Sequence, residues 1–383
     1  MALQIRKSVN RLTDTEKAKF VHACLRLKYM PSPISGRTWD TWARWHFEVW
    51  LPLQSRLGEP KGKEASYFSV VHGTPAFLPW HRWYTRLLEL DLQAVSGDPD
   101  LTIPYWDWGY DAALPDPTKG KIWGDNLDDP DPDNYNWFLG GSGTADNDWV
   151  VTTGPFAYQA GRWAITFSEG FSPPSSDGSD PGLGKDGPEL RRAIGVEPSV
   201  AENTRKLATV AQVHEILELP FDTSPWNRMP TPLFDPTGGV AYDPNKHNFF
   251  RCRFERDLHN VGHRFVGRTM LRGTAPNDPS FFLHHANVDR IWSKWQDKHL
   301  GESYVPLLPV PGVPGLGLDE MMYRFDRTVR SVLDRFALGY DYDGMASDDG
   351  FMPDDVQKEG GKPSTPPGTG GGHGHGHGHG HAH

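Results

Sequence analysis

The sequence predicts a mainly α-helical protein in which a four-helix bundle holds a dinuclear metal site, with long irregular loops and a few short strands around it. Apolar side chains recur every three or four residues in several stretches, which is typical of helices with one buried face. Six histidines lie within or next to these stretches, in two groups of three. Between the stretches, Asp, Pro, Gly and Ser are frequent, and such segments form loops. The histidines should therefore meet inside one bundle.

The first helix is predicted to begin at Thr13-Asp-Thr-Glu16, a capping box whose end side chains satisfy free backbone N–H groups. The apolar residues that follow at helical spacing are Phe20, Val21, Cys24, Leu25 and Leu27. The residues that indicate a second helix are Trp39, Trp42, His46, Val49 and Trp50. Their spacing places His46 on the apolar face of that helix.

The run from His72 to Arg82 reads as a loop containing Gly and Pro that leads into a third helix. Pro79 stands where a helix can begin, because a proline at the first helical position removes no N–H group that the helix needs. The apolar residues that continue this helix are Trp83, Leu87, Leu88 and Leu90. We therefore expect His81 on a helix and His72 in the loop before it.

Two further helices should carry the second group of histidines. Phe250 to Phe265 is predicted to be one helix with His259 and His263, which are four residues apart and so emerge on one face. Asp278-Pro279 is an N-cap followed by proline at the first helical position. The helix after it carries Phe281, His285, Val288, Trp292 and Trp295. A ligand from this neighbouring helix would complete a triad in bundle geometry.

The remaining segments are predicted to be irregular. Tyr110 to Pro188 should form an ordered loop rather than a second domain, and four prolines between Val305 and Pro314 predict extended chain. We expect one domain over residues 1–345 and a disordered tail over 346–383 that ends in a His-Gly repeat. The repeat is a purification tag, a native metal-binding tail or a low-complexity accident, and its strict alternation favours the second.

The composition argues against several classes of partner. A net charge of -10 without a long basic run disfavours nucleic acid and anionic membrane surfaces. Cys24 and Cys252 are too few for a disulfide framework or a cysteine-based zinc module. No apolar stretch approaches the ~20 residues that cross a bilayer, and the N-terminus lacks the apolar core of a Sec-type signal. We expect a cytoplasmic location or export by a partner protein.

The ligand type points to copper. A single helical histidine is more often a satisfied core residue than a ligand, but burying six imidazoles without partners would cost on the order of several kcal/mol. Di-iron and magnesium sites are bound by carboxylates, and two-zinc hydrolases usually include an aspartate, whereas sites made of imidazoles alone suit copper. Two facing triads are therefore expected to hold two copper ions and to serve dioxygen chemistry.

Four segments of the chain resemble the type 3 copper family, and within it the bacterial tyrosinases. The segments are Phe77-Leu-Pro-Trp-His-Arg82, Pro104-Tyr-Trp-Asp-Trp108, Leu258-His-Asn-Val-Gly-His263, and Asn277 to Trp292. Tyr340-Asp-Tyr342 resembles the motif that closes the family's catalytic domain, so the similarity extends over residues 4 to 345. The resemblance implies that one copper is held by His46, His72 and His81, and the other by His259, His263 and His285, with the adjacent His284 excluded.

The resemblance also implies the reaction. It is the oxidation of small phenols to o-quinones by dioxygen, preceded in a tyrosinase by hydroxylation of a monophenol at the ortho position. A catechol oxidase or o-aminophenol oxidase would lack the hydroxylation, and a haemocyanin-like protein would bind dioxygen without turnover. A zinc hydrolase or a metal store is a remote alternative. A separate copper-loading or caddie protein is a possible partner.

In bacterial members of the family, a glutamate before the second motif and an asparagine within it orient a water that deprotonates the phenol. The matching residues here are Glu255 and Asn260. Glu255 lies only four residues before His259, closer than in the family pattern. Either an intervening turn is deleted, or the helix continues and places Glu255 one turn from His259. Both alternatives leave the carboxyl group near copper.

Other candidates surround the two motifs. Arg264 resembles a position that contacts the substrate, and its alternative is a solvated helix charge. Phe281 and the loop from Met270 to Thr274, including Gly273, would flank the substrate ring. Asp289 lies one turn beyond His285 and either orients a ligand or pairs with a nearby arginine.

Overall fold

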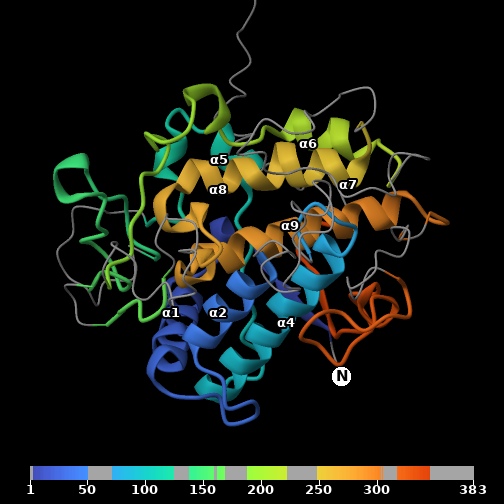
Figure 1. The fold of residues 1–383 in the computed structure, drawn as a ribbon, viewed down its shortest axis with the longest axis horizontal. Coiled ribbons are helices and arrows are strands. Elements are labelled where there is room, and N and C mark those ends of the chain that lie inside the picture. The colour runs from blue at the N-terminus through green and yellow to red at the C-terminus, as the bar shows by residue number, and fades with distance from the viewer. Residues whose placement is uncertain are drawn as a thin grey trace, which may run out of the picture.

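The computed structural model describes residues 3–50, 71–124, 138–158, 162–168, 188–221, 248–302, 304 and 317–345. Its α-helices in these ranges are α1 (Asp14–Tyr29), α2 (Trp39–Trp50), α4 (Phe77–Ser96), α5 (Trp108–Ala112), α6 (Val210–Leu217), α7 (Phe250–Arg253), α8 (Asn260–Val266) and α9 (Ser280–Lys298). In Figure 1, α2, α4 and α9 cross the middle of the molecule and α8 runs above them. Helix α4 packs against both α1 and α9. The predicted mainly helical fold is confirmed.

Helix α1 begins as its sequence predicts. The Thr13 hydroxyl accepts a hydrogen bond from the Glu16 N–H at 3.2 Å, and the Glu16 carboxylate accepts one from the Thr13 N–H at 2.9 Å. These bonds satisfy donors that have no partner inside the helix. The buried face of α1, with Phe20, Cys24 and Leu27, then joins the core.

Helix α4 begins at Phe77, two residues before the position suggested by Pro79. Proline is tolerated at this point because first-turn N–H groups have no acceptor within the helix. The helix ends at Gly97, whose φ of 72° is left-handed and therefore favours glycine. Most of α4 is buried, including His81 and Arg82, because other elements surround it.

The predicted helix from Phe250 to Phe265 contains an irregularity that its spacing does not reveal. A π-helical turn, Phe254–His259, separates α7 from α8, and the Asn260 N–H donates to the Glu255 carbonyl, five residues back. The chain thus stays helical between Glu255 and His259, which is the second of the two alternatives. Single π turns inside α-helices are frequent at functional sites.

Two short parallel strands join residues from opposite ends of the chain. Strand β1 (Gln4–Arg6) pairs with β2 (Tyr340–Tyr342), and Arg6 lies opposite Tyr342. The described parts of residues 110–188 consist largely of turns and short 3₁₀ helices. Four aromatic side chains from them enter the common core, namely Trp123, Phe138, Phe156 and Trp163. The proline-rich segment 305–314 and the tail 346–383 lie outside the described residues.

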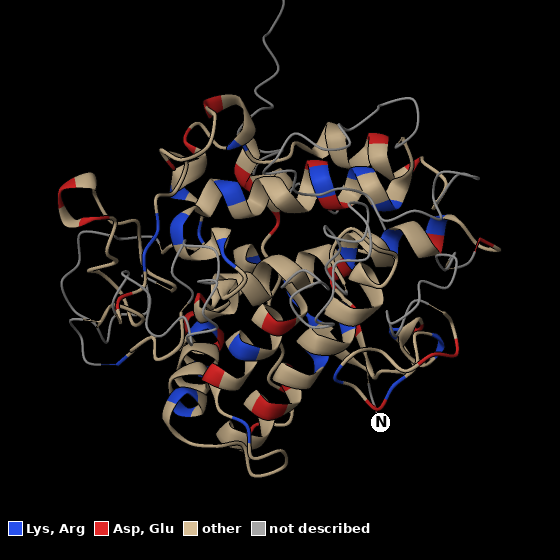
Figure 2. Ribbon diagram, viewed as in Figure 1, with Lys and Arg blue, Asp and Glu red and all other residues tan. Residues whose placement is uncertain are grey.

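Figure 2 shows that basic and acidic positions are interspersed along the outer helices and loops. The core is rich in aromatic side chains, and these include nine fully buried tryptophans among the described residues: Trp39, Trp42, Trp80, Trp106, Trp108, Trp123, Trp163, Trp292 and Trp295. No helix in the described ranges combines the length and apolar character needed to cross a membrane.

Candidate metal centre

The structure gathers the histidines into two clusters. His46 from α2, His72 from the turn before α4 and His81 from α4 form the first cluster. The second contains His259 from the π turn, His263 from α8, and His284 and His285 from α9. Within each cluster one nitrogen of every ring lies within 4.8 Å of the others. The six residues predicted from the sequence are therefore brought together, and His284 joins them.

The two clusters face each other across the contact between α4 and α9. The rings of His81 and His285 stack with their centroids 4.3 Å apart and an interplanar angle of 14°. Phe77 closes one side, at 4.7 Å from His259 and 4.8 Å from His81. Phe281 lies between the clusters, at 4.8 Å from His46 and 4.2 Å from His285. Phe281, predicted to flank the substrate, is thus wedged directly against both groups.

Backbone carbonyls fix the orientation of several imidazoles. The Nδ1 atoms of three rings lie within hydrogen-bonding distance of a carbonyl, in the pairs His46 with Gly273 at 2.6 Å, His81 with Phe77 at 2.8 Å, and His263 with Met270 at 2.6 Å. A carbonyl can only accept, so Nδ1 carries the hydrogen in each ring and Nε2 keeps a free lone pair in the neutral form. These rings therefore present Nε2 as a potential metal ligand.

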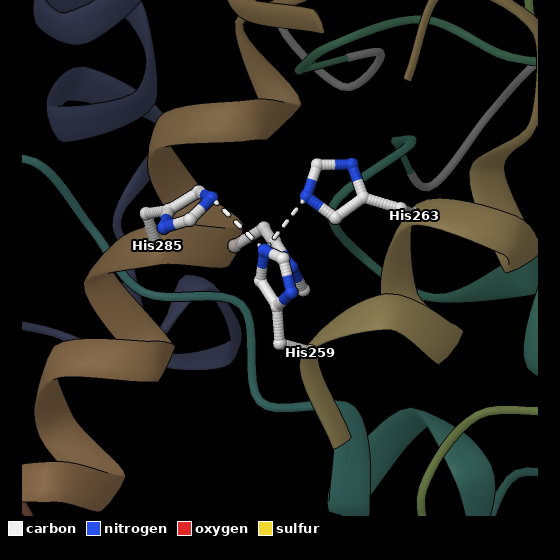
Figure 3. A group of neighbouring side chains, drawn as sticks. His259, His263 and His285 are labelled. Atoms are coloured by element: carbon white, nitrogen blue, oxygen red, sulfur yellow. Dashed lines mark hydrogen bonds between the residues drawn. The ribbon is translucent and has the colours of Figure 1, made fainter. Parts of the chain in front are cut away.

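The nitrogens of the second cluster point at one another, as Figure 3 shows. The Nε2 atom of His259 lies 3.0 Å from that of His263 and 3.3 Å from that of His285. The His259 Nδ1 lies 2.9 Å from the Asn260 side-chain oxygen, so its Nε2 also carries a lone pair. Nitrogen lone pairs at this distance repel each other unless a cation lies between them. In the first cluster, the Nε2 atoms of His46 and His81 are buried without a hydrogen-bond partner. The donor set therefore fits a bound metal, and imidazoles alone suit copper.

Burial keeps the histidines neutral, as ligation requires. It lowers the pKa of His46 to about 3 and that of His263 to about 4. Burial also lowers the pKa of His72, His81 and His285 well below the ordinary value. A neutral imidazole can bind a metal without first releasing a proton.

His284 and His285 are adjacent but face different surroundings. His285 contacts His81 and Phe281, between the two clusters. His284 lies with its ring 4.9 Å from that of Trp108 and against the backbone of Gly262. The His284 ring also lies 5.0 Å from His259 and 4.7 Å from His263, so it belongs to the same cluster. His285, which stacks on His81 of the first cluster, stays the preferred prediction for the ligand.

Gly262 provides the space that His284 occupies. A Cβ atom at Gly262 would lie 2.4 Å from Cε1 and 2.7 Å from Nδ1 of His284. The contact with Trp108 limits how far the His284 ring can move away from it. We expect Gly262→Ala to lower the free energy of unfolding by about 1–3 kcal/mol, as overpacked cores do. Urea unfolding measures this effect. The double variant Gly262→Ala/His284→Ala should be less destabilised than the sum of the two single variants, and strict additivity would contradict the predicted clash.

Glu255 is buried and lies beside the residue that follows His72. Both of its carboxylate oxygens accept a hydrogen bond from the Gly73 N–H, at 2.9 and 3.1 Å. Burial raises the pKa of Glu255 to about 8, while the Gly73 N–H and the Arg251 charge act in the opposite direction. Glu255 and Asn260 thus contact residues on both sides of the site: Glu255 contacts Gly73 beside the first cluster, and Asn260 contacts His259 in the second.

The guanidinium of Arg264 is directed at the main chain. It donates to the carbonyls of Asn260 at 3.1 Å, Arg256 at 3.3 Å and Thr204 at 3.5 Å. Two of these carbonyls belong to the π turn and the residue after it, so Arg264 stabilises that irregular segment. Arg264 is half-buried, and its predicted contact with the substrate stays a prediction.

Asp289 pairs with arginine, which is the second of the alternatives considered for it. Its carboxylate accepts hydrogen bonds from Arg82 at 2.5 Å and Arg6 at 3.2 Å, and from the hydroxyls of Tyr340 at 2.5 Å and Tyr342 at 2.6 Å. All of these groups are buried. Arg82 directly follows His81, so this network joins the two histidine-bearing helices α4 and α9.

Sequence reasoning missed the carbonyls that orient the rings. Met270 and Gly273 were predicted to flank the substrate through their position in a loop, yet their backbone oxygens contact His263 and His46. No sequence pattern identifies such contacts, because every residue has a carbonyl group.

Comparisons with known proteins agree over most of the chain. Residues 36–298, which include all six predicted ligands, match the family model described as the common central domain of tyrosinase. A tyrosinase from Streptomyces glaucescens is 34% identical over 336 residues, covering 88% of this chain and 97% of that protein. A tyrosinase from Streptomyces lincolnensis is 33% identical, with coverages of 84% and 92%. Grixazone synthase from Streptomyces griseus subsp. griseus is 31% identical, with coverages of 82% and 91%.

Proposed function

This chain belongs to the tyrosinase family of copper oxidoreductases, and on that premise we propose that it hydroxylates monophenols at the ortho position and oxidises the resulting diphenols to o-quinones with dioxygen. Membership itself establishes a copper-dependent phenol oxidase. The finer assignment, monophenol as well as diphenol oxidation, is our proposal. The observation that carries it is the buried carboxyl of Glu255 beside the two facing histidine clusters.

The proposed ligands are His46, His72 and His81 for one copper, and His259, His263 and His285 for the other. The convergence of ring nitrogens within each cluster supports this assignment. So do the carbonyl contacts that direct Nε2 inward. When bound, the copper pair supplies the redox chemistry and the place where dioxygen reacts.

The substrate would enter at the open edge of the clusters. His72, His263, Asn260 and Arg264 are half-buried, whereas most of the other residues around the clusters are buried. Phe281 offers an aromatic surface between the two clusters. A guanidinium has five N–H donors and three of those of Arg264 bond to carbonyls, which leaves donors for a polar substituent of the phenol.

Glu255 would receive the proton of a monophenol through a water held between it and Asn260. A phenol with a pKa of ~10 is protonated at neutral pH, so its hydroxylation needs a base that removes this proton. A carboxylate has four acceptor positions, and the Gly73 N–H occupies only part of them. Because the pKa of Glu255 is raised to about 8, its deprotonated form is a stronger base than an exposed carboxylate, and the fraction in that form grows as the pH rises toward 8.

The activity is tested with copper-loaded protein in parallel assays on tyrosine, L-DOPA and o-aminophenol. Oxygen uptake together with quinone absorbance is expected for both tyrosine and L-DOPA. Turnover of diphenol or o-aminophenol without any turnover of tyrosine would replace the proposal by a catechol or o-aminophenol oxidase. Reversible oxygen binding without turnover would indicate an oxygen carrier.

Exchange of Glu255 for glutamine should separate the two activities. We expect monophenol hydroxylation to fall by about 10²–10⁴-fold, the range of general base catalysis, with a much smaller effect on diphenol oxidation. Initial rates on tyrosine and L-DOPA measure the ratio. Asp257→Asn is the matched control, because Asp257 lies in the same π turn but pairs with Arg253 and Arg256. An unchanged ratio in Glu255→Gln would remove Glu255 from the mechanism.

A further inference from the structure

The main chain at Gly73, directly after His72, is held from two sides by side chains of one helical stretch. The Gly73 N–H donates to both carboxylate oxygens of Glu255, at 2.9 and 3.1 Å. The Gly73 carbonyl accepts a hydrogen bond from the Arg251 guanidinium at 3.1 Å. Arg251 and Glu255 are four residues apart and both are buried. We call this arrangement the Gly73 clamp.

His72 is the candidate ligand that most needs such support. The other five lie in helical segments, where the backbone sets the direction of each side chain, whereas His72 lies in a turn. Gly73 has a φ of 73°, a left-handed conformation that is unfavourable for residues with a Cβ atom. The bond from the Thr74 hydroxyl to the Val71 carbonyl, at 2.8 Å, is internal to the turn. The clamp ties this turn to a helical stretch distant in sequence.

Each half of the clamp fixes a different peptide plane. The Gly73 N–H belongs to the peptide that joins His72 to Gly73, so its bond to Glu255 restrains ψ of His72 and thereby the direction of the imidazole. The Gly73 carbonyl belongs to the following peptide, which Arg251 restrains. The bond from Arg251 involves a charged donor, and such bonds are roughly twice as strong as neutral ones. Burial strengthens them further.

We infer that Arg251 and Glu255 are positioning residues for His72, so that the helix leading into the second histidine group completes the first. This inference rests on the proposed role of His72 as a copper ligand. If Arg251 served only to balance a charge on Glu255, its guanidinium would not need to contact the Gly73 carbonyl. Copper binding at the first triad therefore depends on Arg251, which lies outside both triads.

The test is Arg251→Met in the full chain, titrated with copper. We expect the affinity for the first-triad copper to fall by about 10–100-fold, as for other groups that orient metal ligands, while the second triad keeps its copper. At intermediate copper the variant should show the electron paramagnetic resonance signal of isolated Cu(II). Hydrogen–deuterium exchange of a peptide containing Gly73 should accelerate, with exchange in α9 unchanged.

Two further variants control for charge and position. Arg251→Lys keeps the charge and a donor, so it should recover part of the lost affinity. Arg253→Met removes the same charge two residues further on, where Arg253 pairs with Asp257 and Glu215 instead. It should retain both coppers. Equal weakening of both copper sites in Arg251→Met would overturn the inference, because that result indicates a general loss of structure.

The wild-type chain provides a test that does not depend on a folded variant. If the Gly73 amide exchanges as fast as an exposed amide, the clamp does not exist. Glu255→Gln keeps an acceptor for the Gly73 N–H and should keep both coppers. Loss of the first copper in Arg251→Met with unchanged hydroxylation in Glu255→Gln would overturn the proposed mechanism but not the clamp. Retention of the first copper in Arg251→Met, together with reduced hydroxylation in Glu255→Gln, would overturn the clamp and leave the proposed mechanism intact.

Discussion

Replacing Asp289 by alanine is expected to lower the free energy of unfolding by about 3–5 kcal/mol, because it leaves the buried charges of Arg82 and Arg6 without their partner. The two tyrosine hydroxyls that donate to Asp289 would also lose their acceptor. Urea unfolding of the copper-free protein measures the effect without the contribution of metal binding. A loss below about 1 kcal/mol, the size expected for a surface pair, would contradict the argument.

Asp297→Ala is the matched control on the same helix. Asp297 pairs with Arg335 at 2.8 and 2.9 Å, but its side chain is 48% exposed. Solvent screens such a pair, so we expect a cost of about 0–1 kcal/mol. The contrast between two aspartates that both bind arginine isolates the effect of burial.

The same network predicts a dependence of stability on pH. Burial alone would raise the pKa of Asp289, but Arg82, Arg6 and the tyrosine hydroxyls bring it below the ordinary value. A carboxyl with a lowered pKa contributes its stability above the pKa of the unfolded chain, about 3.9, and loses it as the pH falls through the folded value. Asp289→Asn should therefore flatten the acid side of the stability profile. An unchanged slope below about pH 4 would exclude this contribution.

Exchange of His285 for asparagine is expected to reduce quinone formation by more than about 100-fold. Groups that merely orient a ligand cost 10–100-fold when removed, and loss of a ligand should exceed that range. The copper content should fall toward one ion per chain, since His259 and His263 alone would bind the second ion weakly. Metal analysis and oxygen uptake on L-DOPA measure both effects.

His284→Asn is the matched control, one residue away. Because His284 packs against Trp108 and Gly262, its loss should cost stability of about 1–3 kcal/mol but leave two coppers and activity within about tenfold. Equal loss of copper in both variants would assign His284 to the metal as well. An active His285→Asn variant would reverse the choice between the two residues.

The parts of the fold that follow from local side-chain patterns were predictable from the sequence. The capping box at Thr13 and the apolar stripe around His46 each indicated a helix that the structure contains. The π turn was not predictable, because the apolar residues Phe250, Phe254, Leu258, Val261 and Phe265 keep the three- to four-residue spacing of a regular helix through it. Its stabilisation by Arg264 involves backbone carbonyls, which carry no sequence signal.

In the candidate site, too, some features were predictable from side chains and others, made by main-chain atoms, were not. The clustering of the histidines was predictable because their chemistry is specific to the side chain. The carbonyls of Met270 and Gly273, and the bonds between Gly73 and the pair Arg251 and Glu255, join segments far apart in sequence through main-chain atoms. Only the folded chain reveals such contacts.

The parallel pairing of β1 with β2 sets an order of events during synthesis. Tyr340 and Tyr342, which donate to Asp289, lie in the last strand of the described chain. All six predicted ligands leave the ribosome before this strand does. A nascent chain thus carries every imidazole while Asp289, Arg6 and Arg82 still lack part of their network, and pairing of such distant segments is slow. Stable insertion of copper should therefore follow the emergence of residues 340–342 rather than precede it.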